Sequence, residues 1–134
     1  MPTSAFSFAP STRRPSVWLV AVLFVVTAGL TACKSNSPSE IVRQGTEAVA
    51  QNDVEAFAAL LAQSVPASLL ASGLERSYQI YQSRGGVASV EILSEDIDGD
   101  QAQVRDRITF EDGTTSETTS RLVRVGGAWR LAMN

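Results

Sequence analysis

A single acidic residue interrupts the apolar face of a predicted strand and is the first candidate for chemistry. Residues 102–110 alternate between apolar and polar side chains, and Asp106 shares the parity of Val104 and Ile108. A carboxylate removed from water on that face would have a raised pKa, which suits a general base. Two structural interpretations compete with this one: a neighbouring arginine pairs with Asp106, or a bulge shifts the alternation and turns Asp106 towards water. We favour these, because one carboxylate without a second polar partner makes a weak site.

Two tyrosines are the available oxyanion donors for a carboxylate-based isomerase, Tyr78 and Tyr81. Both lie on the apolar stripe of a predicted helix, together with Leu70 and Leu74. Packing in the core with a hydrogen-bonded hydroxyl is therefore the predicted role of both tyrosines.

Several residue types that commonly carry catalysis are missing from the sequence. It contains no histidine, and Cys33 and Lys34 are its only cysteine and its only lysine. Nucleophiles activated by histidine, histidine-metal chemistry and catalytic lysines are therefore excluded. Any catalysis would have to use carboxylates or tyrosines.

Four acidic residues surround Gly99 and superficially suggest a calcium site: Glu95, Asp96, Asp98 and Asp100. An EF-hand loop that begins at Asp96 needs glycine where Gln101 stands and glutamate where Arg107 stands, so the pattern fails. We expect a solvated Asp-Gly hairpin instead, and we predict neither a metal site nor a cofactor.

An uncharged apolar run covers residues 17–30 and ends in Leu30-Thr31-Ala32-Cys33. The run is shorter than the roughly 20 residues that a spanning helix needs, and a pair of arginines precedes it, as in a signal peptide. These features resemble the cleavage and lipidation signal of bacterial lipoproteins. The resemblance implies a signal peptide over residues 1–32 and acylation of Cys33. A retained anchor helix and a buried core cysteine are the alternatives.

The same resemblance predicts where the protein is located. Two or three acyl chains would hold it in the membrane, with residues 33–36 as a short lipidated tether. Lys34 stands where the inner-membrane retention signal of that family has aspartate, which implies an outer membrane location facing the periplasm. The mature chain has nine basic and fourteen acidic residues, a formal charge of −5, which disfavours nucleic acid as a partner.

Two capping patterns predict the starts of two helices after the tether. Ser37 and Glu40 form a capping box for a helix from Pro38 to about Gln51, and Asn52 has the same spacing to a glutamate in a second helix. The inward positions predicted by the helical period are Ile41, Gly45, Ala48 and Val49 in the first helix and Val54, Phe57, Ala58 and Leu61 in the second.

A third helix is predicted to end at the paired glycines 85–86. Because Gly73 disfavours helix, the start is predicted to lie nearer Ser72 than Pro66. From residue 87 the pattern changes to period two and predicts four strands separated by turns. Helices packed on one face of an antiparallel sheet make an α+β domain.

Five arginines lie on neighbouring predicted strands: Arg105, Arg107, Arg121, Arg124 and Arg130. They could form a patch that faces anionic lipid headgroups or glycan phosphates, but such charges more often solvate the open face of a sheet. Trp129, in the last strand, is predicted to anchor that strand against the first helix. Stacking on a sugar is the alternative role.

Three segments, together with the order of the helices, resemble small envelope lipoproteins with a nuclear-transport-factor-2-like, cystatin-like cone domain of unknown function. They are the Asn52-Asp53 joint, the strand entry Gly99-Asp100-Gln101-Ala102-Gln103-Val104 and the closing Leu122-Val123-Arg124-Val125-Gly126-Gly127-Ala128-Trp129-Arg130-Leu131. The resemblance implies a domain over residues 37–134, with N-terminal helices packed on a curved antiparallel four-stranded sheet. Such cones commonly enclose a pocket, and the superfamily includes isomerases, dehydratases and non-catalytic modules.

The sequence thus favours a lipid-anchored envelope protein that acts as a non-catalytic binding or assembly module for an unidentified small-molecule or protein ligand. The alternative is an isomerase or dehydratase of a small apolar carbonyl compound, with Asp106 as the base. A homodimer formed through the sheet is compatible with either function.

Overall fold

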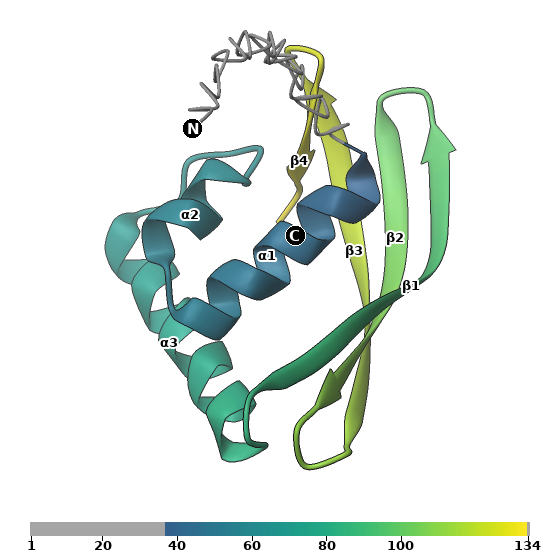
Figure 1. Cartoon of the computed structure of the whole chain (residues 1–134). Coiled ribbons are helices and arrows are strands. Elements are labelled where there is room, and N and C mark those ends of the chain that lie inside the picture. The colour runs from purple at the N-terminus through teal and green to yellow at the C-terminus, as the bar shows by residue number, and fades with distance from the viewer. Residues whose placement is uncertain (1–36, 134) are drawn as a thin grey trace, which may run out of the picture. The chain divides into compact units, whose positions relative to one another are not determined.

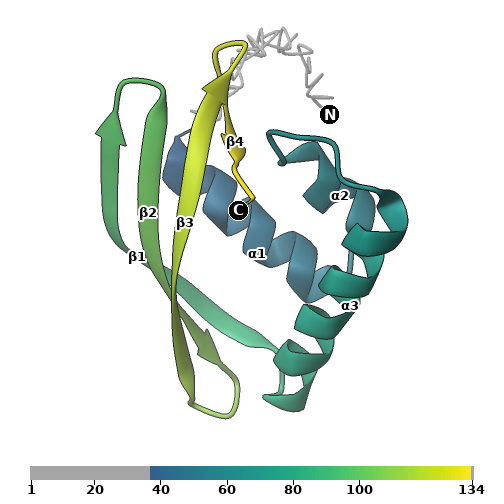
Figure 2. The same ribbon diagram turned by 180° about the vertical axis from the view of Figure 1, so that it is seen from behind.

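The computed structural model describes residues 37–133, which form three helices followed by four strands. The four strands pair as an antiparallel sheet in the order of the sequence. All three helices lie on one side of this strongly bent sheet, and α1 crosses its concave face (Figures 1 and 2). The α+β class is therefore confirmed. The elements are α1 (Pro38–Gln51), α2 (Val54–Ala59), α3 (Ala67–Ser83), β1 (Val87–Asp98), β2 (Gln101–Phe110), β3 (Thr115–Val125) and β4 (Ala128–Leu131).

Helix α1 has the predicted start and the predicted inward face. The Ser37 side chain accepts a hydrogen bond from the Glu40 backbone N–H at 3.3 Å, and proline occupies the first turn. All four predicted inward residues are buried, and Val42 and Thr46 are buried beside them. At Gly45 an added Cβ would lie 3.3 Å from Leu131 Cδ1, so glycine lets the last strand approach the helix closely.

The prediction that Asn52 caps the second helix is wrong. Asn52 ends α1 in the left-handed conformation, with φ of 53°, and its backbone N–H bonds back to the last turn of α1. The neighbouring Asp53 caps α2 by accepting from the Ala56 N–H at 2.9 Å. Asparagine adopts the left-handed backbone conformation more easily than most residues. Asn52 therefore ends α1 in this conformation, and Asp53 is the N-cap of α2.

The predicted late start of the third helix is also wrong. Helix α3 begins at Ala67, directly after Pro66, and runs through Gly73. The buried side chains of Leu70 and Leu74 stabilise the first turns by packing, which offsets the roughly 1 kcal/mol that glycine costs in a helix. The paired glycines follow the helix as predicted, with φ of 85° and 96°.

The sheet owes its bend to its first strand, and its core side packs on α1. The pairing of β1 with β2 shifts register between Val87 and Ser89 and again between Ile92 and Ser94, and such bulges bend and twist a sheet. A buried apolar cluster joins Ile41 and Val42 of α1 to Ala102, Val104, Leu122 and Trp129 of the sheet. The predicted anchoring of the last strand by Trp129 is therefore confirmed.

Strand β4 is short and covers one end of β3 only. It pairs with residues 122–125 of β3, and its other edge bonds with the loop after α2, where the Leu131 N–H donates to the Leu60 carbonyl at 2.7 Å. Figures 1 and 2 both show β4 beside one end of β3. In residues 37–133 no helix has the length and apolar character needed to cross a membrane. Cys33 and the predicted signal peptide lie outside the described residues.

Candidate functional site

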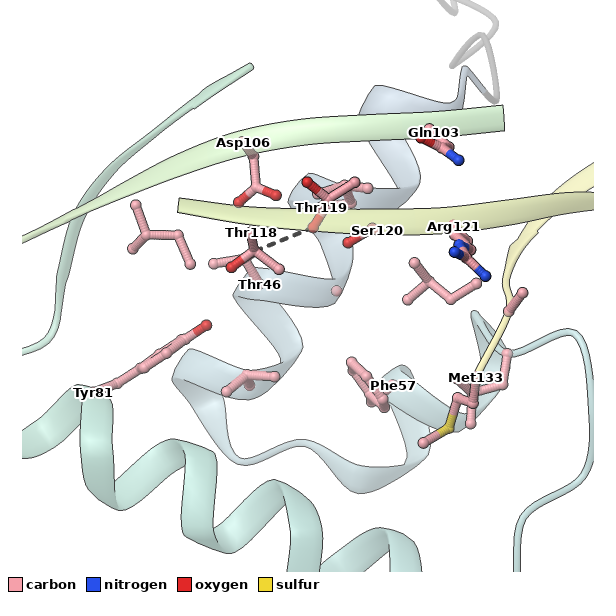
Figure 3. Close-up of a pocket in the computed structure, with 17 residues that line it drawn as sticks. Thr46, Phe57, Tyr81, Gln103, Asp106, Thr118, Thr119, Ser120, Arg121 and Met133 are labelled. Atoms are coloured by element: carbon pink, nitrogen blue, oxygen red, sulfur yellow. Dashed lines mark hydrogen bonds between the residues drawn. The ribbon is translucent and has the colours of Figure 1, made fainter. Parts of the chain in front are cut away.

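A cavity of about 480 Å³ lies between α1, the concave face of the sheet and the chain around α2 and β4. This volume falls in the range of small-molecule sites. Apolar side chains from the helices and from β4 form much of the wall, and hydroxyl groups of β3 line the side opposite α1 (Figure 3). The polar residues that line it are Thr46, Tyr81, Gln103, Asp106, Thr118, Thr119, Ser120 and Arg121.

Asp106 faces this cavity with only 1% of its surface exposed. Both structural interpretations of this residue are therefore wrong. The bulge at Ile92 lies in β1, so the alternation along β2 is intact and Asp106 pairs in regular register with Thr118. The flanking arginines point to the other face of the sheet, where both bind Glu117 (2.5 and 2.8 Å).

The carboxyl group of Asp106 is incompletely satisfied. Its Oδ1 atom is buried without a hydrogen-bond partner, and Asp106 forms no ion pair within residues 37–133. Burial raises the pKa of Asp106 above its ordinary value of 3.8, and the hydrogen bond from its own backbone N–H lowers it in part. A buried acceptor of this kind is stabilised by any ligand that donates a hydrogen bond or carries a positive charge.

Tyr81 extends from α3 towards the same cavity, and Figure 3 shows its hydroxyl end directed to the Asp106 side. Burial raises the pKa of Tyr81 above 10.0, and the negative charge of Asp106 raises it further. The ring packs edge-on against Phe110, with ring centres 5.4 Å apart, as a core tyrosine does. The predicted hydrogen bond of its hydroxyl is not formed with any described residue. Tyr78 is half-buried and does not line the cavity.

Sequence reasoning missed three hydroxyl residues of the cavity wall: Thr46, Thr118 and Ser120. Thr118 and Ser120 lie opposite Asp106 and Val104 in the ladder, so they share the inner face. The threonine-rich composition of the third strand was the available signal, because such a strand is polar on both faces. The hydroxyl of Thr46 donates to the Val42 carbonyl at 3.2 Å, the dashed line of Figure 3, and is thus satisfied within α1.

Most of the arginines that could form a basic patch bind or stack on neighbouring residues. Arg107 Nη1 lies 3.4 Å from Glu91 Oε2, and Arg107 also binds Glu117. Arg124 stacks over the Trp129 ring, 4.5 Å from its centre, and lies 4.0 Å from Asp100. Arg130 donates to the Ala59 carbonyl. These contacts favour solvation of the open sheet face over a free anion-binding surface.

The acidic residues around Gly99 do not converge on one point. The Asp98-Gly99-Asp100 turn joins β1 to β2 as the predicted hairpin. Glu95 is turned towards α1, where it accepts from the Ser39 N–H at 2.8 Å. In the part of the chain that the structure describes, no group of three potential ligands could hold a metal ion.

Comparison with known proteins shows likeness at the level of structure alone. No protein-family model and no curated protein matches the chain. A Campylobacter jejuni protein described as a candidate NTF2-like transpeptidase is similar over 73% of this chain and 100% of its own, with a TM-score of 0.64 and 15% identity.

Two further solved structures are similar with TM-scores of 0.50. One is an NTF2-like protein of unknown function from Silicibacter pomeroyi, with 13% identity over 70% of this chain and 87% of its own. The other is a SEC-C motif protein from Rhodopseudomonas palustris, with 14% identity over 73% and 77%. At these identities the likeness shows the fold and no activity. Residues 37–133 have the nuclear-transport-factor-2-like fold, with helices packed on a curved four-stranded antiparallel sheet.

Proposed function

We propose that the protein is a lipid-anchored binding module of a bacterial cell envelope, held in the outer membrane and facing the periplasm. The sequence of residues 17–33 supports the anchor. Helix α1 begins at Pro38, so a lipidated Cys33 would hold this helix close to the bilayer. Intact mass spectrometry of the protein from membranes should find Cys33 as an acylated N-terminus. Cys33→Ala should release the protein from the membrane fraction, and an unacylated chain that retains residues 17–30 would contradict the anchor.

The observation that carries the binding function is the unpartnered carboxyl oxygen of Asp106 in a cavity of ligand size. A ligand with a hydrogen-bond donor and an apolar body matches both the oxygen and the apolar wall. We favour binding over catalysis because the second polar group is a weak catalyst: the raised pKa of Tyr81 makes its hydroxyl a poorer donor to an oxyanion.

Small probes test this function directly. Pentylammonium and pentan-1-ol both combine a donor with an apolar chain, and NMR of the full chain in detergent should show shifts at Asp106, Tyr81 and Thr118 when either binds. Asp106→Leu fills the site with an apolar side chain and should remove these shifts. Asp96→Asn, which changes an exposed carboxylate of β1, is the matched control and should leave them unchanged. Shifts that persist in Asp106→Leu would contradict the proposal.

A carboxylate-based isomerase or dehydratase is the second candidate, because Asp106 and Tyr81 line the same cavity and burial raises the pKa of the carboxyl group. In this function Asp106 takes a proton from the carbon next to a carbonyl group and returns it to the γ-carbon, while Tyr81 donates a hydrogen bond to the carbonyl oxygen. A β,γ-unsaturated cyclic ketone would then be converted to its conjugated isomer, followed by ultraviolet absorbance. Asp106→Asn should lower the rate by roughly 10²-fold or more. Equal rates with the variant and the wild type would exclude this candidate.

A further inference from the structure

Half of β3 has an unpaired edge in the part of the chain that the structure describes. Strand β2 pairs with residues 115–123 of β3, whereas β4 pairs only with residues 122–125. The edge of residues 115–120 therefore faces away from β2 without a neighbouring strand. Edges of this kind add further strands readily, and natural proteins often protect them with proline, lysine or a bulge. Residues 115–120 contain neither proline nor lysine, and their pairing with β2 is regular.

The direction of the backbone groups on this edge follows from the ladder. The Phe110 N–H donates to the Thr114 carbonyl at 2.9 Å, so the alternation of an antiparallel pair turns the even residues of β3 towards β2. The odd residues Thr115, Glu117 and Thr119 turn their N–H and C=O groups outward. The Arg121 carbonyl follows the same rule, since it accepts from the Ala132 N–H at 2.9 Å. The outward groups of the first three bond to no described residue.

This edge is also a rim of the cavity that contains Asp106. Thr118, Thr119 and Ser120 line the cavity, and Thr118 is the direct ladder partner of Asp106 (Figure 3). A strand added beside β3 would place the side chain opposite Thr118 on the inner face, two strand spacings or roughly 10 Å from Asp106. Only a long side chain on the added strand can span that distance to the carboxyl group.

Charge decides which long side chain fits. Within residues 37–133 Asp106 has an unpartnered oxygen and no ion pair, and these residues include fourteen acidic residues and eight arginines, a formal charge of −6. Glu117, the charged residue of the free edge, is bound by Arg105 and Arg107 on the outer face. The other titratable groups that line the cavity are the Tyr81 hydroxyl, which is neutral at pH 7, and the Arg121 guanidinium. A cation on a flexible stem therefore complements the site.

We propose that residues 115–120 of β3 bind an extended peptide as an added strand, and that a lysine or arginine of this peptide reaches Asp106 in the cavity. This inference rests on the proposed binding function and names its ligand. Backbone hydrogen bonds to Glu117 and Thr119 hold the peptide, and the cavity selects the cationic side chain.

The test uses an acetylated and amidated seven-residue peptide with threonine at odd positions and valine, lysine and valine at positions 2, 4 and 6. Calorimetry with the full chain in detergent should show binding, and norleucine in place of lysine should weaken it about tenfold or more. When the peptide pairs antiparallel with β3 and lysine lies opposite Thr118, the N–H groups of positions 3 and 5 face β3. Methylation of these two nitrogens should abolish binding, whereas methylation at positions 2 and 6 should change it little.

Two protein variants test the same contacts from the other side. Thr119→Pro removes an outward N–H without removing a bond to β2, and proline is tolerated on an edge strand, so binding should fall about tenfold or more while the circular dichroism spectrum is kept. Thr119→Val keeps the N–H and is the matched control. Asp106→Asn should remove the preference for lysine over norleucine and leave the effect of backbone methylation.

The outcomes separate this inference from the proposed function. If pentylammonium binds in an Asp106-dependent manner and both methylated peptides bind equally, the cavity is a small-molecule site and edge pairing is wrong. If no peptide binds at millimolar concentration, the inference is overturned. A mass of the protein that rises with concentration and is reduced to a monomer by Thr119→Pro would assign the edge to a second copy of this chain, and would also overturn it.

Discussion

Replacing Asp106 by valine should make the protein more stable at neutral pH, although it changes a fully buried residue. The wild-type carboxyl group has an unpartnered oxygen, and an unsatisfied buried polar group costs on the order of 1–3 kcal/mol. Valine removes this cost, suits a strand and fits the apolar neighbours Val104 and Ile108. For a domain of this size, about 1 kcal/mol corresponds to about 4–8 °C in Tm. An increase of that order is expected for Asp106→Val.

The pH dependence of the stability gained by removing the Asp106 carboxylate gives a second test. Because burial raises the pKa of Asp106, the folded state binds the proton more tightly than the unfolded state, in which the pKa is close to 3.8. The wild type therefore loses stability as the pH rises from about 3.8 through the higher pKa of the folded protein. Asp106→Asn cannot ionise at this position. The difference in Tm between this variant and the wild type should thus increase from pH 3.5 to pH 7.

The assay is thermal unfolding of the full chain in detergent, followed by circular dichroism at both pH values. Asp96→Asn removes one negative charge from the exposed surface and controls for the change in net charge. The reasoning is refuted if Asp106→Val lowers the Tm at pH 7. It is also refuted if the difference between Asp106→Asn and the wild type is the same at both pH values. Either result would mean that the carboxyl group is satisfied in the folded protein.

Three further predictions concern Tyr81, Leu122 and Asn52. In Asp106→Asn the pKa of Tyr81 should fall towards 10.0 but stay above it, because burial remains, and titration of the tyrosinate absorbance would disprove the coupling if the pKa did not change. Leu122→Ala removes a side chain that is 1% exposed and should cost about 2–5 kcal/mol in urea unfolding, whereas a cost below that of a surface substitution would remove Leu122 from the core. Asn52→Ala should cost about 1–2 kcal/mol, because alanine is strained at a φ of 53°, and Asn52→Gly should avoid this strain.

Periodicity predicted the elements well because it reflects burial directly. The inward face of α1, the alternation along β2 and the position of Trp129 all depend on which side chains meet the core. The choice between neighbouring residues for one role was harder to predict. Asn52 and Asp53 can both cap a helix, and the choice between them depends on which residue must take the left-handed turn that ends α1. The start of α3 likewise depends on the packing of Leu70, which no local propensity contains.

The sequence predicted which face of the sheet Asp106 lies on, but not the surroundings of its carboxyl group. The alternation of residues along β2 predicted that Asp106 lies on the inner face. We nevertheless favoured an exposed or arginine-paired Asp106, because burying an isolated carboxylate costs free energy. Two features outside β2 decided otherwise. The bulges lie in β1, and Glu117 of β3 binds both flanking arginines on the opposite face of the sheet. Neither the strand that bulges nor the partner of an arginine can be derived from the sequence of β2 alone.

The retention of a carboxyl group at this position argues for a ligand. Arg105 and Arg107 cannot reach Asp106, because side chains of adjacent strand residues leave opposite faces of the sheet and Glu117 holds both guanidinium groups there. Within residues 37–133 Asp106 thus has only its own backbone N–H as a donor, and one of its oxygens is directed at a cavity whose rim is a strand edge that no described strand pairs with. A residue that lowers stability and has no internal partner is expected where binding requires it. We therefore expect the group that completes Asp106 to lie outside residues 37–133, and we expect substitution of Asp106 to raise stability and weaken binding together.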